Sequence, residues 1–274
     1  MIHLDSFYTI GKTHKICEDY VIHGNDPISY VILGDGCSSS PDTDVGVRLL
    51  VQTVKAELKA GLGHLKPESM LKITNKEIKT ICNALMIPYN SMDSSLVILK
   101  EHFDYDTNKK MIRLIMAGDG IVIGKMKHRL QPDYTIVSYE KEMPYYLSYA
   151  LDKERNNEYD RIARRIDPNG HTKGINNGNG IVYVPYWDLT VIDYPIEDYQ
   201  YIMVASDGLN SFYKQETGDK WPLDITIKSL GMFKSVTGEF LKRRIKRILK
   251  DYEKEGIYHY DDLSIGIIYN LEDR

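Results

Sequence analysis

Acidic side chains stand at the ends of apolar segments throughout this 274-residue chain. Asp35, Asp119 and Asp207 each follow such a segment within two residues, and each directly precedes a glycine. Glu18-Asp19 and Asp261-Asp262 stand instead directly before an apolar segment. The end of an apolar strand is a rigid support for a functional side chain, and an Asp-Gly step turns sharply and leaves room for a ligand. These positions are therefore the first candidates for chemistry.

Carboxylates that meet in one place need a cation or a proton. Two unit charges 4 Å apart repel by about 4 kcal/mol at an effective dielectric constant near 20, so a cluster must protonate or bind a positive ion. A set of oxygen ligands with little nitrogen or sulfur suits Mg²⁺ or Mn²⁺. For any single aspartate a solvated turn is the better interpretation, but five segments with the same arrangement favour a divalent metal centre.

The elements that must position these residues are mostly short strands. Turn residues bound β-rich runs, and apolar residues at helical spacing mark three helices, with Pro41-Asp42-Thr43 as a cap for the first. Gly118-Asp119-Gly120 is expected to form a tight turn between two consecutive strands. The expected strands are 7–10, 20–22, 30–33, 95–99, 112–116, 121–123, 135–137, 181–184, 190–192, 201–205 and 263–269, and the expected helices are 47–58, 67–85 and 238–253.

This order of elements suits an α+β fold in which helices cover two β-sheets. Residues 141–180 differ from the rest, because they are rich in charge and end in a run of glycine and asparagine, 174–180. We expect a short helical or irregular insert with a mobile end there. The acidic residues are spread from one end of the chain to the other, so residues 1–274 are expected to form a single domain.

Composition excludes several classes of function. A net charge of −4 and a pI near 6.1 argue against sequence-independent nucleic-acid binding. No apolar run approaches the length of a membrane span, and the first residues do not resemble a signal peptide. Cys17, Cys37 and Cys82 form no CxxC pair, which argues against a disulfide framework. A soluble, cytoplasmic protein is expected, and its 21 tyrosines against 5 phenylalanines hint at half-exposed sheet faces.

Six segments, in order along the chain, resemble the motifs of the metal-dependent type-2C serine/threonine protein phosphatases. The first carries Gly11, His14 and Glu18-Asp19 in the spacing of that family's opening motif, and the fifth reads Ser-Asp-Gly around Asp207. Each motif is weak alone, but six in the family's order are specific, and the compact chain is typical of a bacterial-like member. The segments are 11–19, 33–36, 93–97, 118–120, 205–209 and 261–264.

The resemblance implies a fold, a reaction and a set of ligands. The fold would be two packed antiparallel β-sheets flanked by helices, a four-layer α-β-β-α sandwich. A water bridging two Mn²⁺ or Mg²⁺ ions would hydrolyse phosphoserine or phosphothreonine in a phosphorylated protein substrate, by a chain for which a monomer is favoured. The implied roles are a bridging ligand (Asp35), ligands of one ion (Asp207 and Asp261), a carbonyl ligand of the other (Gly36), contacts through metal-bound waters (Glu18 and Asp19) and support of a third ion (Asp119).

Two positions depart from the family's common pattern. Cys37 stands where many members have a histidine proposed as the general acid, so either water or another side chain would protonate the leaving group. His14 stands where many members have an arginine that clamps the substrate phosphate. The resemblance therefore implies that His14 is the catalytic residue that binds the phosphate, as a donor without the bidentate fork. For the last ligand, Asp262 is the alternative to Asp261.

The departures motivate two other hypotheses. One is a phosphatase-like binding or sensor module that has lost catalysis; the presence of Asp35, Asp207 and Asp261 favours the enzyme instead. The other is a phosphoester hydrolase that acts on a small molecule, because the metal site makes the chemistry while the surrounding segments select the substrate.

Overall fold

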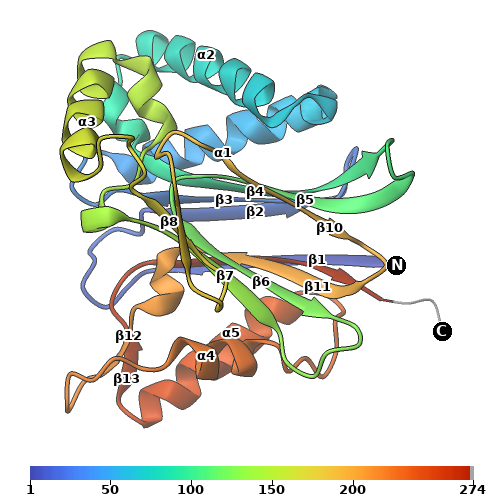
Figure 1. Cartoon of the computed structure of the whole chain (residues 1–274). Coiled ribbons are helices and arrows are strands. Elements are labelled where there is room, and N and C mark those ends of the chain that lie inside the picture. Colours follow the sequence, from blue (N-terminus) through green and yellow to red (C-terminus); the bar gives the residue numbers. More distant parts are fainter. Residues whose placement is uncertain (272–274) are drawn as a thin grey trace.

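Two antiparallel sheets stacked face to face form the centre of the protein in a computed structural model, which describes residues 1–271 (Figure 1). The seven-stranded sheet has the order β1 (Ile2–Thr9), β14 (Leu263–Asn270), β11 (Tyr199–Ala205), β6 (Gly120–Met126), β7 (Asp133–Tyr139), β8 (Lys173–Asn176) and β9 (Ile181–Val184). The five-stranded sheet has the order β10 (Thr190–Pro195), β5 (Lys109–Ala117), β4 (Ser94–Asp104), β3 (Tyr30–Gly36) and β2 (Asp19–Gly24). A small ribbon pairs β12 (Phe212–Lys214) with β13 (Ile257–His259).

Helices cover both outer faces of the sandwich. In Figure 1, α1 (Thr43–Lys59), α2 (Pro67–Leu85) and α3 (Lys153–Ile166) lie on the side of the five-stranded sheet. The other two, α4 (Leu223–Leu230) and α5 (Phe240–Lys254), lie under the seven-stranded sheet. The expected fold class, a four-layer α-β-β-α sandwich, is therefore confirmed.

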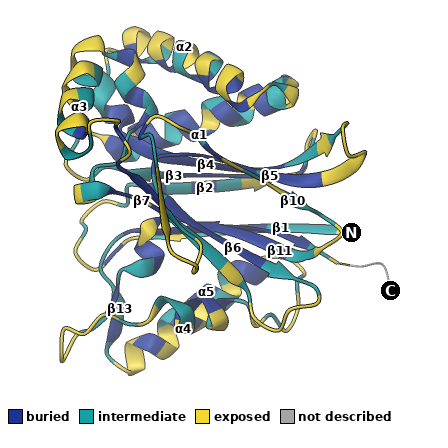
Figure 2. Ribbon diagram, in the orientation of Figure 1, coloured by how far each residue is buried: buried dark blue, intermediate teal, exposed yellow. Residues whose placement is uncertain are grey.

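Aliphatic residues fill the space between the layers. Val31, Leu33 and Val97 are fully buried between the sheets, and β3 reads as a continuous buried run because both of its faces are covered. The helices bury the stripes expected from their spacing, such as Val47, Val51 and Val54 of α1. Figure 2 shows the result as buried strands between helices whose outer faces are exposed.

Most predicted elements are confirmed, with longer strands, but two local predictions are wrong. Gly118–Gly120 is not the turn of a hairpin, because β5 pairs with β4 and β10 whereas β6 pairs with β11 and β7. This segment instead carries the chain from one sheet to the other. Asp42 precedes α1 in the left-handed conformation (φ 52°) and its side chain makes no capping bond.

Residues 141–180 contain more regular structure than the sequence suggests. They form the 3₁₀ turn η4 (Leu147–Leu151), α3 and β8, so the first residues of the glycine- and asparagine-rich run belong to a strand that pairs with β7. β8 and β9 form a hairpin that extends the seven-stranded sheet. Of the two alternatives for the insert, short helical or irregular, the helical one is confirmed by α3, and the strand β8 was not expected.

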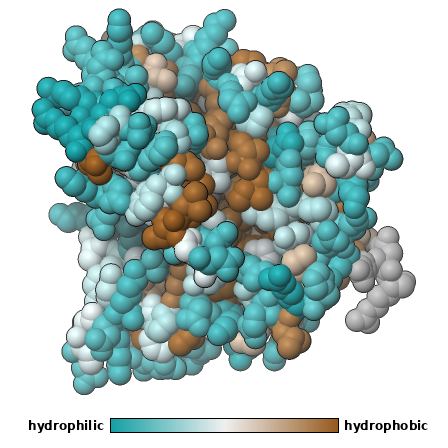
Figure 3. Space-filling model, viewed as in Figure 1, coloured by the Kyte–Doolittle hydropathy of each residue, from teal (hydrophilic) through white to brown (hydrophobic). Residues whose placement is uncertain are grey.

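Tyrosines lie on half-exposed sheet faces, as Tyr20, Tyr134 and Tyr194 do, and also gather around this insert. We call the tyrosine cluster the set of Tyr139, Tyr145, Tyr149, Tyr159 and Tyr186, which pack together. The ring centroids of the last four lie about 5 Å from their neighbours. Figure 3 shows that the surface over α3 is hydrophilic and that hydrophobic side chains collect in the middle of the same face. None of the helices among residues 1–271 is long and apolar enough to cross a membrane.

Candidate metal centre

The predicted acidic residues lie at one end of the sandwich, the end opposite to the N-terminus. The register of the five-stranded sheet places Asp19 of β2 opposite Asp35 of β3, and Asp35 opposite Ser95 of β4. Asp207 follows β11 and Asp261 precedes β14, and these two strands pair next to each other. Like charges opposite one another weaken a sheet, so placing Asp19 beside Asp35 has a structural cost that a bound cation would offset.

Asp35 lies at the middle of this group. Its carboxyl is buried, and burial together with the charges of neighbouring aspartates raises its pKa well above the usual value. The aspartates whose charges act on it are Asp19, Asp207, Asp119 and Asp261. The chain thus brings carboxylates from both sheets within electrostatic reach of one side chain.

The two aspartates that flank Asp35 are perturbed in the same direction. Burial raises the pKa of Asp19 to about 7, and the charge of Asp262 adds to the shift. Burial also raises the pKa of Asp207 to about 7, with Asp119 and Asp261 as the charged neighbours. Ser206 partly opposes the shift of Asp19, because its hydroxyl donates a hydrogen bond of 2.7 Å to Asp19 Oδ2.

Asp119 reaches the group from the crossing between the sheets. Burial raises its pKa, and two groups oppose that shift: Ser95, whose hydroxyl donates to Asp119 Oδ1, and the positive charge of Lys173 in β8. The Asp119 amide in turn donates to Ser95 Oγ at 3.1 Å. Ser95 therefore fixes both the backbone and the side chain of Asp119.

Asp261 and Asp262 have different surroundings. The Asp262 side chain is buried, and its two oxygens accept the backbone N–H groups of Gly11 (2.7 Å) and Glu18 (2.6 Å). The Asp261 side chain is 46% exposed. Asp262 thus holds the 11–18 loop against the sandwich. Asp261 accepts the Asp262 N–H through Oδ1 at 2.9 Å, which leaves Oδ2 as its oxygen for a ligand.

His14 lies between these two carboxylates rather than in open solvent. Its Nε2 is 3.3 Å from Asp261 Oδ1, and its Nδ1 is 3.2 Å from Asp262 Oδ2. Burial opposes the charged ring, but Asp262, Asp261 and Glu18 outweigh it and raise the pKa of His14 above 6.5. Both ring nitrogens face carboxylates, so His14 is placed to orient acidic side chains, and its role in binding the substrate phosphate stays a prediction.

Glu18 and Gly36 complete the predicted set. The Glu18 carboxylate accepts from the Thr43 hydroxyl, and its carbonyl accepts the N–H of Gly36 at 3.1 Å. A side chain at position 36 would collide with the backbone of Glu18, so glycine is required there. Ligand atoms of His14, Glu18 and Asp262 also lie within 4.8 Å of one another. Since Asp262 already accepts two backbone bonds, we regard the Asp35 group as the principal site.

The residues at this end fit a hard divalent cation. The donor set is almost entirely carboxylate oxygen, several of these acids have raised pKa values, and Asp19 Oδ1 is buried without a hydrogen-bond partner. The positive charge of Lys173 is the cation that acts most strongly on Asp119. A divalent ion would supply the missing positive charge.

Sequence reasoning missed the polar residues that orient the acids. The clearest is Asp93, a buried side chain whose oxygens accept from Ser40 (2.7 Å), Ser148 (2.5 Å) and Arg155 (2.7 Å). Its carbonyl also accepts the N–H of Cys37 at 2.8 Å. Asp93 therefore joins the loop after Asp35 to the insert. Its position directly before an apolar strand is the same signal that marked Asp19 and Asp262.

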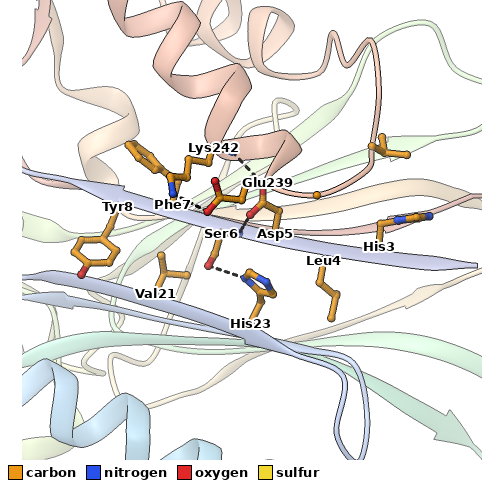
Figure 4. Close-up of a pocket in the computed structure, with 12 residues that line it drawn as sticks. His3, Leu4, Asp5, Ser6, Phe7, Tyr8, Val21, His23, Glu239 and Lys242 are labelled. Atoms are coloured by element: carbon orange, nitrogen blue, oxygen red, sulfur yellow. Dashed lines mark hydrogen bonds and ion pairs between the residues drawn. The ribbon is translucent and has the colours of Figure 1, made fainter.

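A hollow of about 620 Å³ lies elsewhere, beside β1, β2 and the start of α5 (Figure 4). Both of its acidic residues are paired: Asp5 Oδ2 accepts the N–H groups of Leu241 (2.6 Å) and Lys242 (3.1 Å), and Glu239 accepts from the Lys242 ammonium at 2.6 Å. Ser6 and His23 pair with each other at 2.9 Å. This hollow thus lacks the free carboxylates that gather at the other end of the sandwich.

Comparison with known proteins shows the same fold in solved phosphatases. A bacterial serine phosphatase is similar over 100% of both chains with a TM-score of 0.57 and 13% identity. The serine/threonine phosphatase Stp1 from Staphylococcus aureus has a TM-score of 0.56 and 13% identity over 99% of this chain and 96% of its own. The catalytic domain of the serine/threonine protein phosphatase PstP, in complex with two manganese ions, has a TM-score of 0.52 and 15% identity over 99% of each chain.

Sequence comparison adds nothing to this likeness. No protein-family model and no curated protein matches the chain. At identities of 13–15% the structural likeness establishes the fold, and the assignment of ligands and reaction has to come from the geometry of this chain.

Proposed function

We propose that this protein hydrolyses phosphoserine and phosphothreonine in phosphorylated proteins with the help of Mn²⁺ or Mg²⁺. The observation that carries the proposal is the group of buried aspartates around Asp35, which two sheets bring together and which the described cations leave largely uncompensated. The solved structures that share the fold include serine/threonine phosphatases, and one of them holds manganese.

Residues at the acidic end of the sandwich would hold two ions, and this end also has a residue for a third. Asp35 would lie between the first two, Asp207 and Asp261 would serve one, and the Gly36 carbonyl would serve the other. Glu18 and Asp19 would act through water, and Asp119 would serve the third. Such ions lower the pKa of bound water and offset charge on phosphate oxygens.

The chain's own contribution is to hold the acids in place before any ion arrives. Ser206 fixes Asp19, and Ser95 fixes Asp119. His14 lies against Asp261, and Asp262 anchors the loop that carries Glu18. Preorganised ligands of this kind need no rearrangement during the reaction. Such electrostatic preorganisation is usually the largest contribution to the rate.

The location and assembly state remain part of the proposal. Cys17, Cys37 and Cys82 are free thiols, which favours a reducing compartment and hence the cytoplasm. We propose a monomer, because one chain supplies every residue assigned above. A signalling role follows from the substrate class.

The experiment that tests the function is a hydrolysis assay with the full chain. With Mn²⁺ the protein should release phosphate from a phosphoserine peptide and from p-nitrophenyl phosphate, and EDTA should abolish both reactions. Isothermal calorimetry with MnCl₂ separates the alternatives. A binding module that has lost catalysis would give no turnover and would bind Mn²⁺ weakly or not at all. Turnover of small phosphoesters without any of peptides would indicate a small-molecule hydrolase.

A further inference from the structure

A groove of about 250 Å³ lies beside the start of α5, where the segment 232–235 packs against that helix. Its described lining combines cations with apolar side chains and contains no carboxylate. The whole chain has a net charge of −4, so a basic lining of this kind is a local feature. The cations are Lys234, Arg243, Arg244 and Arg247, and the apolar side chains are Met232, Phe233 and Phe240.

The three arginines keep donor nitrogens free for a ligand. Arg244 donates through Nε and Nη2 to the carbonyl of Ser229, which fixes its guanidinium beside the groove. Arg243 donates through Nη2 to the carbonyl of Thr237 at 2.8 Å. Within residues 1–271, the guanidinium of Arg247 donates no hydrogen bond, and its side chain is 65% exposed. Each guanidinium therefore retains N–H groups that the fold does not use.

Positive charge is crowded on this part of α5. Arg243 and Arg247 stand four residues apart, so they are neighbours on the helix surface, where like charges destabilise a helix. Burial and the charge of Arg247 lower the pKa of Arg244. Asp251 offsets little of this charge, because its Oδ2 is 3.8 Å from Arg247 Nε and its Oδ1 accepts from Lys254 at 2.8 Å. An anion in the groove would relieve the repulsion.

Aromatic rings support the apolar side of the groove. The Phe233 ring meets Phe240 edge to face, with 5.3 Å between centroids. It meets the rings of Tyr201 and Tyr269 in the same way, at 6.0 Å from each. Met232, the preceding residue, is 60% exposed. A small inorganic anion would leave this apolar surface in water, so the occupant is expected to carry an apolar group next to its negative charge.

The groove lies away from the predicted metal ligands. Tyr269, which supports it, stands near the end of β14, whereas Asp261 precedes the start of that strand. At about 3.3 Å per residue, Tyr269 is about 20 Å along β14 from Leu263. Tyr201 likewise stands near the start of β11, whereas Asp207 follows its end. An occupant of the groove therefore leaves the acidic end of the sandwich free.

From this geometry we propose that the groove is a docking site for a phosphorylated segment of another protein. The phosphoryl group of a phosphoserine or phosphothreonine lies between Arg243 and Arg247. A neighbouring apolar side chain of the same segment covers Met232 and Phe233.

The chemistry of the groove favours this occupant. A phosphoryl group carries close to two negative charges and pairs with the guanidinium fork, so it matches crowded arginines better than a single carboxylate does. Arginine clusters are a recurring means of recognising phosphorylated segments. A volume of about 250 Å³ is small for a whole small-molecule ligand, but it accommodates one side chain of a segment that runs across the surface. The proposal goes beyond the proposed function, because docking here needs no metal and no hydrolysis.

Fluorescence anisotropy with the full chain in EDTA tests the proposal, because EDTA prevents hydrolysis and keeps metal-bound phosphate out of the measurement. The probes are a short labelled peptide with phosphoserine beside leucine and the same peptide with unmodified serine. At about 0.15 M salt, which screens diffuse attraction, the phosphopeptide should bind about tenfold more tightly than the unmodified peptide. Inorganic phosphate should compete only at higher concentration, because it has no apolar group.

The double variant Arg243→Gln/Arg247→Gln should weaken phosphopeptide binding about tenfold, because it removes charge-assisted donors from exposed positions. Lys246→Gln/Lys250→Gln is the matched control, since it removes the same charge from the same helix but both lysines line a different hollow. It should leave the affinity unchanged. Met232→Ser should weaken the phosphopeptide about threefold without changing competition by inorganic phosphate. The melting temperature and the Mn²⁺-dependent hydrolysis of p-nitrophenyl phosphate should match wild type in all three variants.

Several outcomes overturn the proposal. Equal weakening by the two double variants would mean that α5 attracts anions only through its total charge. Equal affinity for the two peptides, together with arginine-dependent binding to phosphatidylserine vesicles, would indicate a membrane surface instead. Inorganic phosphate that competes as well as the phosphopeptide would reduce the groove to a simple anion site.

The same measurements separate this proposal from the proposed function. A wild type that binds the phosphopeptide selectively in EDTA but hydrolyses nothing with Mn²⁺ would remove the proposed function and support the docking site. A wild type that is active with Mn²⁺ but binds both peptides equally in EDTA would remove the docking site alone.

Discussion

The sandwich and the insert that lies beside its acidic end are stabilised by different means. Between the sheets, side chains such as Leu33, Val97 and Leu114 make contacts that need no particular direction. In the tyrosine cluster, by contrast, the hydroxyls are paired individually. Tyr159 donates to the carbonyl of Met143 at 2.6 Å and Tyr145 donates to Asn156 at 2.6 Å.

This difference concerns positional accuracy as much as stability. Aliphatic packing tolerates small shifts, but a hydrogen-bonded aromatic group has a defined orientation, and its loss leaves polar atoms unpaired. The insert is therefore suited to holding its own side chains in defined orientations. The sandwich is suited to bearing the electrostatic strain of the aspartates.

The largest expected effect concerns that strain. Asp35→Asn removes the charge at the middle of the cluster, and we expect Mn²⁺-dependent kcat/KM to fall by roughly 10³-fold, on the scale of losing a principal charge-stabilising group. The same substitution should raise the melting temperature of the metal-free protein, because one buried negative charge is lost.

Kinetics and thermal unfolding in EDTA together check this prediction. Asp193→Asn is the control, since Asp193 pairs with Arg113 at 2.7 Å on the edge strand β10, away from the acids. A fall in both activity and metal-free stability for Asp35→Asn would mean that Asp35 supports the sandwich rather than straining it.

The next effect is the dependence of stability on pH. Asp19 and Asp207 have pKa values of about 7 in the fold, above the usual 3.8. Between these two pH values the folded chain therefore binds more protons than the unfolded chain. The stability that comes from this protonation is fully present below about pH 4 and is lost as the pH rises through 7. At about 1.4 kcal/mol per pKa unit the loss amounts to several kcal/mol.

Urea unfolding without metal at about pH 5 and about pH 8 measures this loss as a lower free energy of unfolding at the higher pH. Mn²⁺ should restore stability at the higher pH, because it binds the folded state. Burial lowers the pKa of His259, so this residue makes the fold less stable as the pH falls below the usual histidine pKa. A metal-free protein that is more stable at pH 8 would show that the aspartates are not strained.

The two regions also differ in how far their sequence predicts them. Strand periodicity and helical spacing located the sandwich, since a residue such as Val51 is buried by a pattern that repeats along its own helix. Asp35 and Asp207 were found for a similar reason: each follows the strand that holds it. The spacing of apolar residues could not predict that β5 and β6 belong to different sheets, because sheet membership depends on pairing between distant segments.

The insert was poorly predicted because its contacts are polar and long-range. The bond between Arg155 and Asp93 spans 62 residues, and no local pattern announces it. The excess of tyrosine predicted half-exposed sheet faces, where Tyr20 and Tyr194 do lie, but it did not predict that Tyr139, Tyr159 and Tyr186 form a core of their own. Composition recorded the excess of tyrosine but carried no information on where the rings meet.

A smaller effect is expected from cutting the bond that holds the insert. Arg155→Met leaves the buried Asp93 with only two serine hydroxyls as side-chain donors. In the wild type the Arg155 side chain is 27% exposed. We expect opening of residues 141–166 to become easier by about 2 kcal/mol, less than for a fully buried pair.

Hydrogen exchange checks this prediction, with faster exchange in η4 and α3 and unchanged exchange in β3 and β4. Arg161→Met is the matched control, because Arg161 is 63% exposed and lies 3.7 Å from Glu158 on the same helix. Faster exchange throughout the sandwich would indicate that the two regions unfold as one unit.

The smallest effect compares two buried lysines, one in each region. Burial lowers the pKa of Lys100 in β4 and of Lys173 in β8 to about 8, but only Lys173 acts on Asp119. Lys173→Met removes a positive charge that competes with a bound cation, so Mn²⁺ affinity measured by calorimetry should rise about threefold to tenfold. Lys100→Met removes an equivalent ammonium, bound to the Gly63 carbonyl at 2.7 Å, and should leave that affinity unchanged. Equal Mn²⁺ affinities in the two variants would mean that Lys173 has a structural role alone. A rise in affinity confined to Lys173→Met would show that a lysine of the insert lowers the negative charge of the metal site in the sandwich.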